Sequence, residues 1–303
     1  SHQDCQLIMA QLWTITGIFV VCATLREIFR DLFQPSGSGA LSSILGRSLF
    51  GLGKRIRWLL PIAGPLTVVI VIAVWTALIT IGFGLIYWPH FPQDFQQPAP
   101  QPHSLSGRIC SVAYFSLVSL TTLASDGLSP QGAWLQVCTA LESLIGIGLV
   151  TASVTRVVLI YPALGRMRTI ARWASILGRA REKPGRNHFA LLDQSLLRDF
   201  AQRIIRARID FIHFPLIYYF HADTEGSSLA HALRGLLEMT REASENREEK
   251  VRFAAVTLEI ALTDLAEVLT VKFVPNADPK KPREVFDAVA DDHLQRDEHE
   301  SDK

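Results

Sequence analysis

The sequence lacks the short motifs that mark most catalytic and cofactor-binding sites. No G-x-G-x-x-G opens a strand–helix unit, and no P-loop, H-E-x-x-H or G-x-S-x-G is present. The cysteines have no C-x-x-C spacing, and the histidines at 213, 221 and 231 are spaced by eight and ten residues, which is not a zinc-site pattern. We therefore expect neither an enzyme nor a resident cofactor or metal.

Charged residues are also scarce. They make up 19% of the 303 residues, against 49% hydrophobic residues, and the mean hydropathy is +0.22. The formal net charge of +1 gives no reason to expect a nucleic acid as a partner. This balance is typical of a chain that lies partly in lipid and partly in water.

Three apolar runs are long enough to cross a bilayer, which needs about 20 apolar residues in a helix. Residues 7–25 contain no charged side chain, and neither do residues 66–88, which end in an aromatic pair suited to the membrane interface. Residues 133–155 contain a single ionisable acid, Glu142. The sequence therefore predicts three transmembrane helices.

Basic residues indicate how these helices are oriented. They cluster in residues 26–60 and again after the third run, whereas residues 89–110 contain only Arg108. By the positive-inside rule, the N-terminus lies outside and the long C-terminal part lies in the cytoplasm. We expect a multi-pass protein of a bacterial-type plasma (inner) membrane.

A shorter apolar segment lies between the second and third runs. Residues 109–122, "ICSVAYFSLVSLTT", are too few to cross, and they are followed by polar residues, glycine and Pro130. A short helix, a polar loop and then a full span predict a re-entrant loop. The segment before it, residues 90–104, is rich in Pro and Gln, so we expect no packed element there.

Residues 66–160 resemble the pore module of bacterial two-transmembrane potassium channels and of their two-pore-domain relatives. The family pattern is a pore helix, Thr-Thr, Val-Gly-Tyr-Gly-Asp, a later proline and an inner helix with a hinge glycine. Thr121, Thr122 and Pro130 match this pattern without a gap, and Gly146 falls on the hinge glycine. The letters "DG" and "SPQ" also resemble the member that conducts both sodium and potassium. The resemblance implies a homotetramer, in which four pore loops surround one axis.

The filter segment departs from the family pattern, because "LASD" stands where the family has Val-Gly-Tyr-Gly. Potassium filters aim successive backbone carbonyls at the ion, and glycine reaches the required backbone angles freely. A side chain in a left-handed conformation costs roughly 1–2 kcal/mol per residue. We therefore expect a wider filter that passes monovalent cations with weak selectivity. The predicted filter residues are Thr121, Thr122, Leu123, Ala124, Ser125, Asp126 and Gly127.

Asp126 has two interpretations that the sequence leaves open. Four carboxylates facing the axis would favour cations and would also attract divalent cations, which prefer oxygen ligands. Alternatively, Asp126 braces the loop through backbone hydrogen bonds and meets no ion. A collapsed loop that closes the pore permanently is a third alternative.

The third run supplies the predicted inner helix. Small and hydroxyl residues four apart on one face suit either the wall of a wet cavity or helix–helix contacts. Glu142 either takes part in transport, as buried membrane carboxylates often do, or braces this helix against the pore helix. The predicted hinge and pore-lining residues are Gly146, Ile147, Val150, Thr151 and Val154.

The remaining chain is read as helical and cytoplasmic. Residues 163–186 are basic and either meet the anionic inner leaflet or form a solvated helix. Helices are predicted near 189–221, 227–245 and 248–272. The predicted domains are an N-terminal extra transmembrane helix (1–25), a cytoplasmic or interfacial linker (26–60), the pore module (61–162), a helical cytoplasmic domain (163–274) and a disordered tail (275–303). Within the linker, residues 41–60 either lie in the inner interface as an amphipathic helix or form a solvated connection.

The sequence thus predicts an all-α membrane protein with three transmembrane helices, a re-entrant pore helix and loop, and a helical cytoplasmic domain. The leading hypothesis for its function is a tetrameric pore-loop cation channel whose partners are membrane lipids and further copies of the chain. The alternative is a non-conducting, channel-like sensor or scaffold that acts through its cytoplasmic domain. Ion flux distinguishes the two.

Overall fold

A computed structural model describes residues 2–33, 40–56, 60–96, 104–123, 127–181, 193–220 and 228–293. The chain divides into two compact units. The first, which we call the membrane unit, comprises residues 1–34, 39–41 and 69–157. The second, which we call the C-terminal unit, comprises residues 35–38, 42–68 and 158–303. The boundary in the third long helix lies at residue 157, close to the predicted domain boundary at 162.

Three helices in the described part of the chain are long and apolar enough to cross a membrane. They are α1 (His2–Phe33), α3 (Leu60–Tyr87) and α5 (Ala133–Arg181). α5 has 49 residues, more than twice the number that a bilayer needs, so it extends well beyond a single span. The other elements of the membrane unit are η2 (Trp88–His90), β1 (Phe95–Gln96), α4 (Leu105–Leu120) and β2 (Ser129–Pro130).

α1 packs on α3 through one face of small and apolar residues. Gly17, Val21, Thr24 and Ile28 recur every three or four residues and are buried. A Cβ on Gly17 would lie 2.5 Å from the carbonyl oxygen of Gly82 on α3. Glycine therefore lets the two backbones approach closely, as small residues do between membrane helices.

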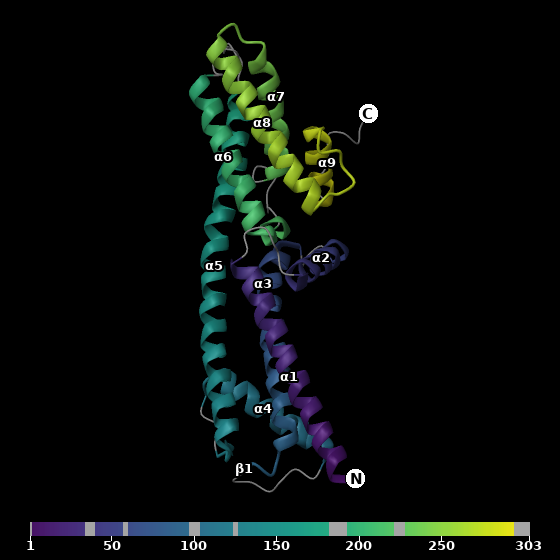
Figure 1. Cartoon of the computed structure of the whole chain (residues 1–303). Coiled ribbons are helices and arrows are strands. Elements are labelled where there is room, and N and C mark those ends of the chain that lie inside the picture. Colours follow the sequence, from purple (N-terminus) through teal and green to yellow (C-terminus); the bar gives the residue numbers. More distant parts are fainter. Residues whose placement is uncertain are drawn as a thin grey trace. The chain divides into compact units, whose positions relative to one another are not determined.

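α4 is a re-entrant helix. Its 16 residues span roughly 24 Å at 1.5 Å per residue, less than the ~30 Å hydrocarbon core. Ser104 caps its start by accepting a hydrogen bond from the Gly107 amide at 3.1 Å. β1, before α4, pairs antiparallel with β2, after it, so the chain enters and returns on the same side (Figure 1).

The segment before α4 corrects one expectation from the sequence. Residues 90–96 are packed, although their Pro- and Gln-rich composition predicted no packed element. Phe91 and Phe95 are buried, and Phe95 contacts Phe115 of α4 edge to face with ring centroids 5.1 Å apart. The reason is tertiary, because aromatic contacts and the pairing with β2 outweigh the local turn preference. Residues 97–103 lie outside the described part of the chain.

The C-terminal unit is a helical bundle built around α8 (Glu249–Lys272), which is buried along one face and packs against α6, α7 and α9. The last part of α5 is tied to this bundle by Arg166, which forms two hydrogen bonds of 2.7 Å to Asp210 of α6. The other helices are α6 (Gln194–His213), η4 (Pro215–Tyr219), α7 (Leu229–Ser244) and α9 (Pro282–Asp292).

The linker between the first two long helices contains α2 (Ala40–Arg55). Phe50 of α2 is buried and packs against Tyr219 and His293, with ring centroids 5.5 and 5.1 Å apart. Gly46 faces the Tyr219 ring, where a Cβ would lie only 2.5 Å away. This part of the linker is therefore a packed element of the C-terminal unit.

The predicted disordered tail is wrong for residues 282–292, which form α9. Val285 and Phe286 are fully buried in the bundle. Asp287 pairs with Arg234 of α7 at 3.3 Å. With Val289 and Ala290, which are also buried, these two apolar side chains form the face that docks this short helix, although its surroundings in the sequence are polar. Residues 294–303 lie outside the described part.

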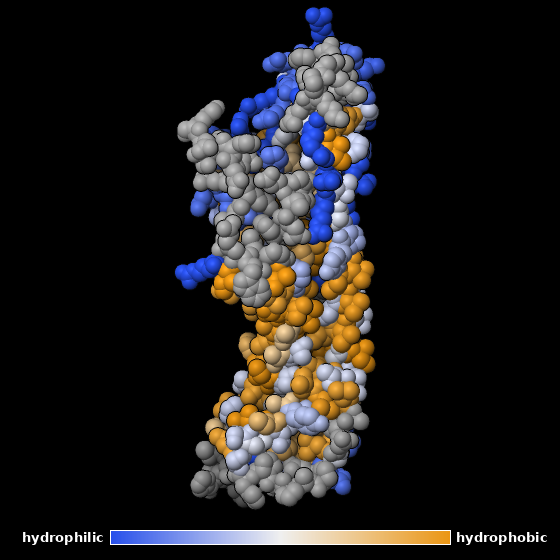
Figure 2. Space-filling model, turned by 180° about the vertical axis from the view of Figure 1, so that it is seen from behind, coloured by the Kyte–Doolittle hydropathy of each residue, from blue (hydrophilic) through white to orange (hydrophobic). Residues whose placement is uncertain are grey.

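Surface character differs between the two units. Figure 2 shows hydrophobic side chains over the long helices of the membrane unit and hydrophilic side chains over the helices of the C-terminal unit. Large apolar side chains such as Phe19, Leu144 and Val150 are more than 60% exposed within the single chain. Such faces require lipid or another protein surface as a neighbour.

Candidate functional site

The end of α4 opens onto a recess of about 310 Å³ in the membrane unit. Its walls come from three helices. Thr76 belongs to α3, Thr121 and Thr122 follow the end of α4, and α5 contributes a stretch from Gly146 to Thr151. The structure thus gathers the paired threonines and four predicted inner-helix residues around one cavity. Those four are Gly146, Ile147, Val150 and Thr151.

The backbone at the end of α4 has an uncommon geometry. The Leu123 amide donates to the Val118 carbonyl at 3.0 Å, and the Thr122 amide donates to the Ser119 carbonyl at 3.1 Å. This is the Schellman pattern, in which glycine usually occupies the left-handed position. Here Thr122 occupies it with φ 58°. A β-branched residue in this region is strained by roughly 1–2 kcal/mol, so the surrounding contacts must hold it.

Gly146 of α5 lies against the last carbonyl of α4. A Cβ on Gly146 would lie 1.7 Å from the oxygen of Leu120. Nearby, the Ser143 hydroxyl lies 2.9 Å from the Ser119 carbonyl, to which it can donate. α4 and α5 therefore meet backbone to backbone at the recess. For Gly146, close packing is the role visible in the contacts, and the hinge role stays a prediction.

Glu142 joins three helices from a fully buried position. Its Oε2 accepts a 2.8 Å hydrogen bond from the Tyr87 hydroxyl of α3, and its Oε1 pairs with the Ser116 hydroxyl of α4 at 2.5 Å. Ser116 also lies 3.1 Å from the Thr80 carbonyl. These are the contacts that the bracing interpretation of Glu142 requires, with α3 as an additional partner.

A buried ion pair links α1 to α5. Arg156 of α5 pairs with Asp31 of α1, and the side chain of Asp31 is only 2% exposed. The guanidinium also lies over the Trp75 ring of α3, 5.8 Å from its centroid. Three membrane helices therefore meet at one charged contact, near the end of the span opposite to the entry of α4.

The remaining predicted site residues either do not line the recess or lie outside the described part of the chain. Leu123, Gly127 and Val154 are exposed, and Gly127 has φ 85°. Ala124, Ser125 and Asp126 lie outside the described residues. Thr151 lines the recess, but its hydroxyl, like that of Thr155, bonds to a carbonyl of its own helix at 2.9 Å.

The recess is lined by backbone, hydroxyl and apolar groups in the described part of the chain. The C-terminal end of a helix is the negative end of its dipole, and at the end of α4 the carbonyls of Leu117, Val118 and Ser119 accept hydrogen bonds. α4 directs this end toward the recess, beside the threonine hydroxyls. No acidic or basic side chain lines this recess in the described part of the chain. The field there comes from backbone and hydroxyl dipoles.

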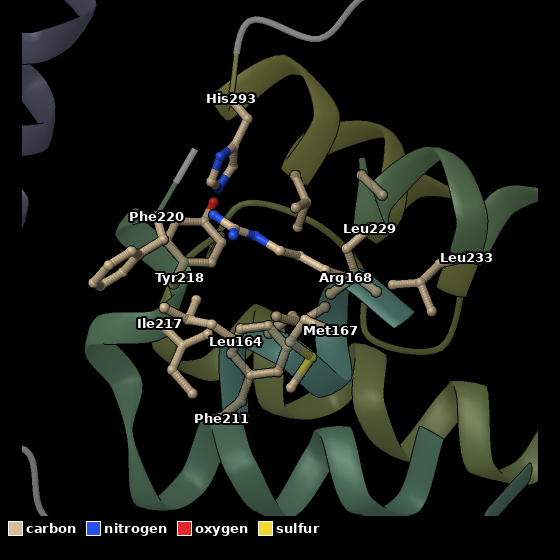
Figure 3. A pocket seen from close by; sticks show the side chains of 13 residues that line it. Leu164, Met167, Arg168, Phe211, Ile217, Tyr218, Phe220, Leu229, Leu233 and His293 are labelled. Carbon is tan, nitrogen blue, oxygen red and sulfur yellow. The ribbon is translucent and has the colours of Figure 1, made fainter. Parts of the chain in front are cut away.

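A second cavity lies within the C-terminal unit, among α5, α6, η4, α7, α8 and α9. Figure 3 shows Leu164, Met167 and Phe211 along one side of it and the Arg168 side chain extending toward Tyr218 and His293. Its volume is about 70 Å³, well below the roughly 300–1,000 Å³ of common ligand sites. Tyr218 is held by a 2.6 Å hydrogen bond to Asp292, and burial raises the pKa of Tyr218 above its usual range. We interpret this cavity as a gap in side-chain packing and not as a ligand site.

The basic segment 163–186 is partly neutralised within the C-terminal unit. Arg166 pairs with Asp210, and Arg181 pairs with Glu242 of α7. Arg168, Arg172 and Arg179 are exposed. The predicted contact with an anionic leaflet thus has three exposed cations in the described part, and residues 182–186 lie outside it.

Comparison with known proteins gives a membrane relative. The chain is 28% identical over 177 residues to the uncharacterized membrane protein YdjJ of Bacillus subtilis (strain 168). The match covers 56% of this chain and 50% of that protein, so the chain spans about half the length of this curated relative. No family model and no solved structure matches the chain. With the three long apolar helices, these findings define an all-α membrane protein.

Several residues of the site were not found from the sequence. The sequence predicts that Tyr87 lies at the membrane interface, but its side chain is fully buried and donates a hydrogen bond to Glu142. No sequence pattern around Ser116 or Asp31 marks either residue as part of a site. A buried carboxylate needs donors and a buried guanidinium needs an acceptor, so partners could be expected. Their identity depends on how the helices are packed.

Proposed function

We propose that this protein is a pore-loop cation channel in which several copies of the membrane unit, four by family resemblance, surround one pathway. The supporting observation is the re-entrant helix α4. It packs against α3 and α5 and ends at Thr121 and Thr122 beside the recess, and the chain after it returns so that β2 pairs with β1. Irregular backbone at membrane depth survives only where it is buried in protein or lines a water-filled path.

The proposed filter begins at the threonines and continues through Asp126. Because glycine is missing from residues 123–126, the filter is wider and less selective than a potassium filter. Asp126 then supplies a ring of carboxylates that attracts cations and binds divalent ions. The N-terminus lies outside a bacterial-type plasma membrane, and the C-terminal unit lies in the cytoplasm.

Ion flux into proteoliposomes tests the proposal. Potassium, sodium and calcium are compared for the native chain, for Asp126→Asn and for Asp94→Asn. Asp94 is a matched control, because it is an exposed carboxylate whose backbone carbonyl accepts a hydrogen bond from Gln131 in the return segment. We expect flux of more than one cation that changes with Asp126→Asn and stays unchanged with Asp94→Asn.

The other outcomes separate the alternatives. Flux of potassium alone would contradict the weakly selective filter. A channel with a closed gate would also pass no ion. Val150→Ser and Val154→Ser test for such a gate, because they make exposed positions of the proposed inner helix α5 polar. If these variants and the native chain all pass no ion, the channel proposal fails. The non-conducting sensor or scaffold, acting through the C-terminal unit, is then favoured.

A further inference from the structure

The outward face of α8 carries large apolar side chains that no described part of the chain covers. Phe253, Val256 and Ile260 are 73%, 48% and 58% exposed, although the surface of the C-terminal unit is mainly hydrophilic (Figure 2). The opposite face of α8 is the one buried in the bundle, so these three side chains point away from it. Apolar patches of this kind mark contact surfaces for another protein.

The spacing of this face is that of a coiled-coil seam. Phe253, Val256, Ile260 and Thr263 follow one another at intervals of three, four and three residues. This is the alternation of the a and d positions of a heptad, whose side chains become buried against a second helix of the same kind. We call these four residues the α8 seam.

Charged side chains flank the α8 seam on both sides. Lys250 and Asp264 are 14 residues apart and lie on one flank, and Arg252 and Glu259 are seven apart and lie on the other. Within the described part of the chain, the side chains of Lys250, Glu259 and Asp264 have no hydrogen-bond or ion-pair partner. Arg252 donates to two backbone carbonyls before the helix and pairs with no described carboxylate.

We propose that the α8 seam binds the α8 seam of a second copy of this chain, with the two helices antiparallel and centred on residue 258. In this register Val256 lies opposite the second copy's Ile260, and Phe253 lies opposite its Thr263. The two copies contribute equally, so the exposed apolar side chains of each are covered by the same residues of the other.

The flanking charges select the antiparallel orientation. Lys250 then lies beside the second copy's Asp264 on one flank, and Arg252 extends toward its Glu259 on the other. The flanking positions of a coiled coil determine the orientation of its helices in this way. A parallel pairing would place Glu259 beside the second copy's Asp264, so two like charges would meet.

The paired seam is short. At each end Glu249 of one copy lies opposite Glu267 of the other, which confines the contact to the residues between them. Stable dimers in solution usually bury about 800 Å² per partner, more than a few turns of helix provide. Chains anchored in one membrane meet at a high local concentration, so a smaller contact suffices there. The pairing goes beyond the proposed channel and does not depend on ion conduction, so the flux experiment and the test below fail independently.

Zero-length cross-linking with a carbodiimide tests the contact. The reagent activates a carboxylate, a lysine amine in direct contact displaces it, and an amide bond forms as the reagent leaves as a urea. Lys250 and Asp264 of one chain lie about 21 Å apart along α8 at 1.5 Å per residue, so an amide between them must join two chains. The full chain is cross-linked in membrane vesicles and the joined peptides are identified by mass spectrometry. We expect the Lys250–Asp264 amide in a species of twice the mass of the chain.

Variants at exposed positions separate the proposed contact from chance proximity. Ile260→Ser should lower the yield of the amide about tenfold, because an apolar contact that holds the helices together is lost. Ile205→Ser, at a comparably exposed position of α6, should leave the yield unchanged. Exchanging the charges, with Lys250→Asp and Asp264→Lys together, should preserve the cross-link with amine and carboxylate reversed.

The opposite results overturn the pairing. They are absence of the Lys250–Asp264 amide in the native chain, a yield that survives Ile260→Ser, and loss of the cross-link in the exchanged chain. A cross-link from Lys250 to a different protein overturns it too, because another partner would then occupy the face.

Discussion

Gly146 leaves no space for a side chain, because a Cβ there would lie 1.7 Å from the Leu120 carbonyl oxygen. Gly146→Ala should therefore displace the end of α4 and lower stability by roughly 1–3 kcal/mol, the usual cost of overpacking. Gly148→Ala is the matched control, since nothing lies within 4 Å of its Cβ position. The midpoint of thermal unfolding, followed by circular dichroism in one detergent, measures both. Equal midpoints would contradict the contact.

The hydrogen bonds of Glu142 support a second prediction about a single residue. Glu142→Leu removes the carboxylate that accepts from the buried Tyr87 hydroxyl, at a cost of about 1–3 kcal/mol for an unsatisfied buried group, whereas the Ser116 hydroxyl can still donate to the Thr80 carbonyl. Glu142→Gln keeps an acceptor in place and should cost much less.

Tyr87→Phe completes a double-mutant cycle on Glu142. If the two side chains act as one contact, Tyr87→Phe should cost little once Glu142→Leu is present. The same unfolding midpoints provide the test. Strictly additive losses would mean that Glu142 and Tyr87 stabilise the fold independently.

The contact between α1 and α5 belongs to the scale of whole elements. Asp31→Asn leaves Arg156 as a buried charge without its partner, which typically costs about 3–5 kcal/mol. Exchanging the two residues, with Asp31→Arg and Arg156→Asp together, should recover part of this loss. Unfolding of the detergent-solubilised chain gives the measurement. No recovery in the exchanged variant would argue against a specific pair between the helices.

The same elements explain why local sequence patterns were not sufficient. Local composition predicts that α9 belongs to a disordered tail and that residues 90–96 form an unpacked loop, and both predictions are wrong. Both segments are short and lie among polar residues, but most of their apolar side chains are buried, as with Phe286 and Phe91. A short segment gains its stability from the surface on which it docks, and that surface is distant in the sequence.

At the scale of the whole molecule, the proposal depends on how many copies of the chain assemble. The proposed channel requires four copies, and Leu144 on α5 is 65% exposed in the single chain. Leu144→Ala should weaken assembly if this face meets another copy. Phe19→Ala is a comparable control, because Phe19 is 72% exposed on α1, outside the pore module. Light scattering of the chain extracted with its native lipids measures the number of copies. A monomer in the native chain would contradict the channel.

The sequence by itself determined the three apolar runs that form the long helices and the re-entrant segment. These depend on local properties, namely runs without charge whose lengths are compared with the thickness of a bilayer. It also singled out Glu142, because one carboxylate in a long apolar run is conspicuous. The paired threonines and Gly146 were found by resemblance.

Only the tertiary structure decided which residues meet. Tyr87 and Ser116 bond Glu142 across 55 and 26 residues of sequence, and Asp31 pairs with Arg156 from another helix. Small residues at helix crossings determine how closely the backbones approach, and this approach selects the partners. The recess beside Thr121 and Thr122 arises in the same way, since its walls come from three helices that no local pattern relates to one another.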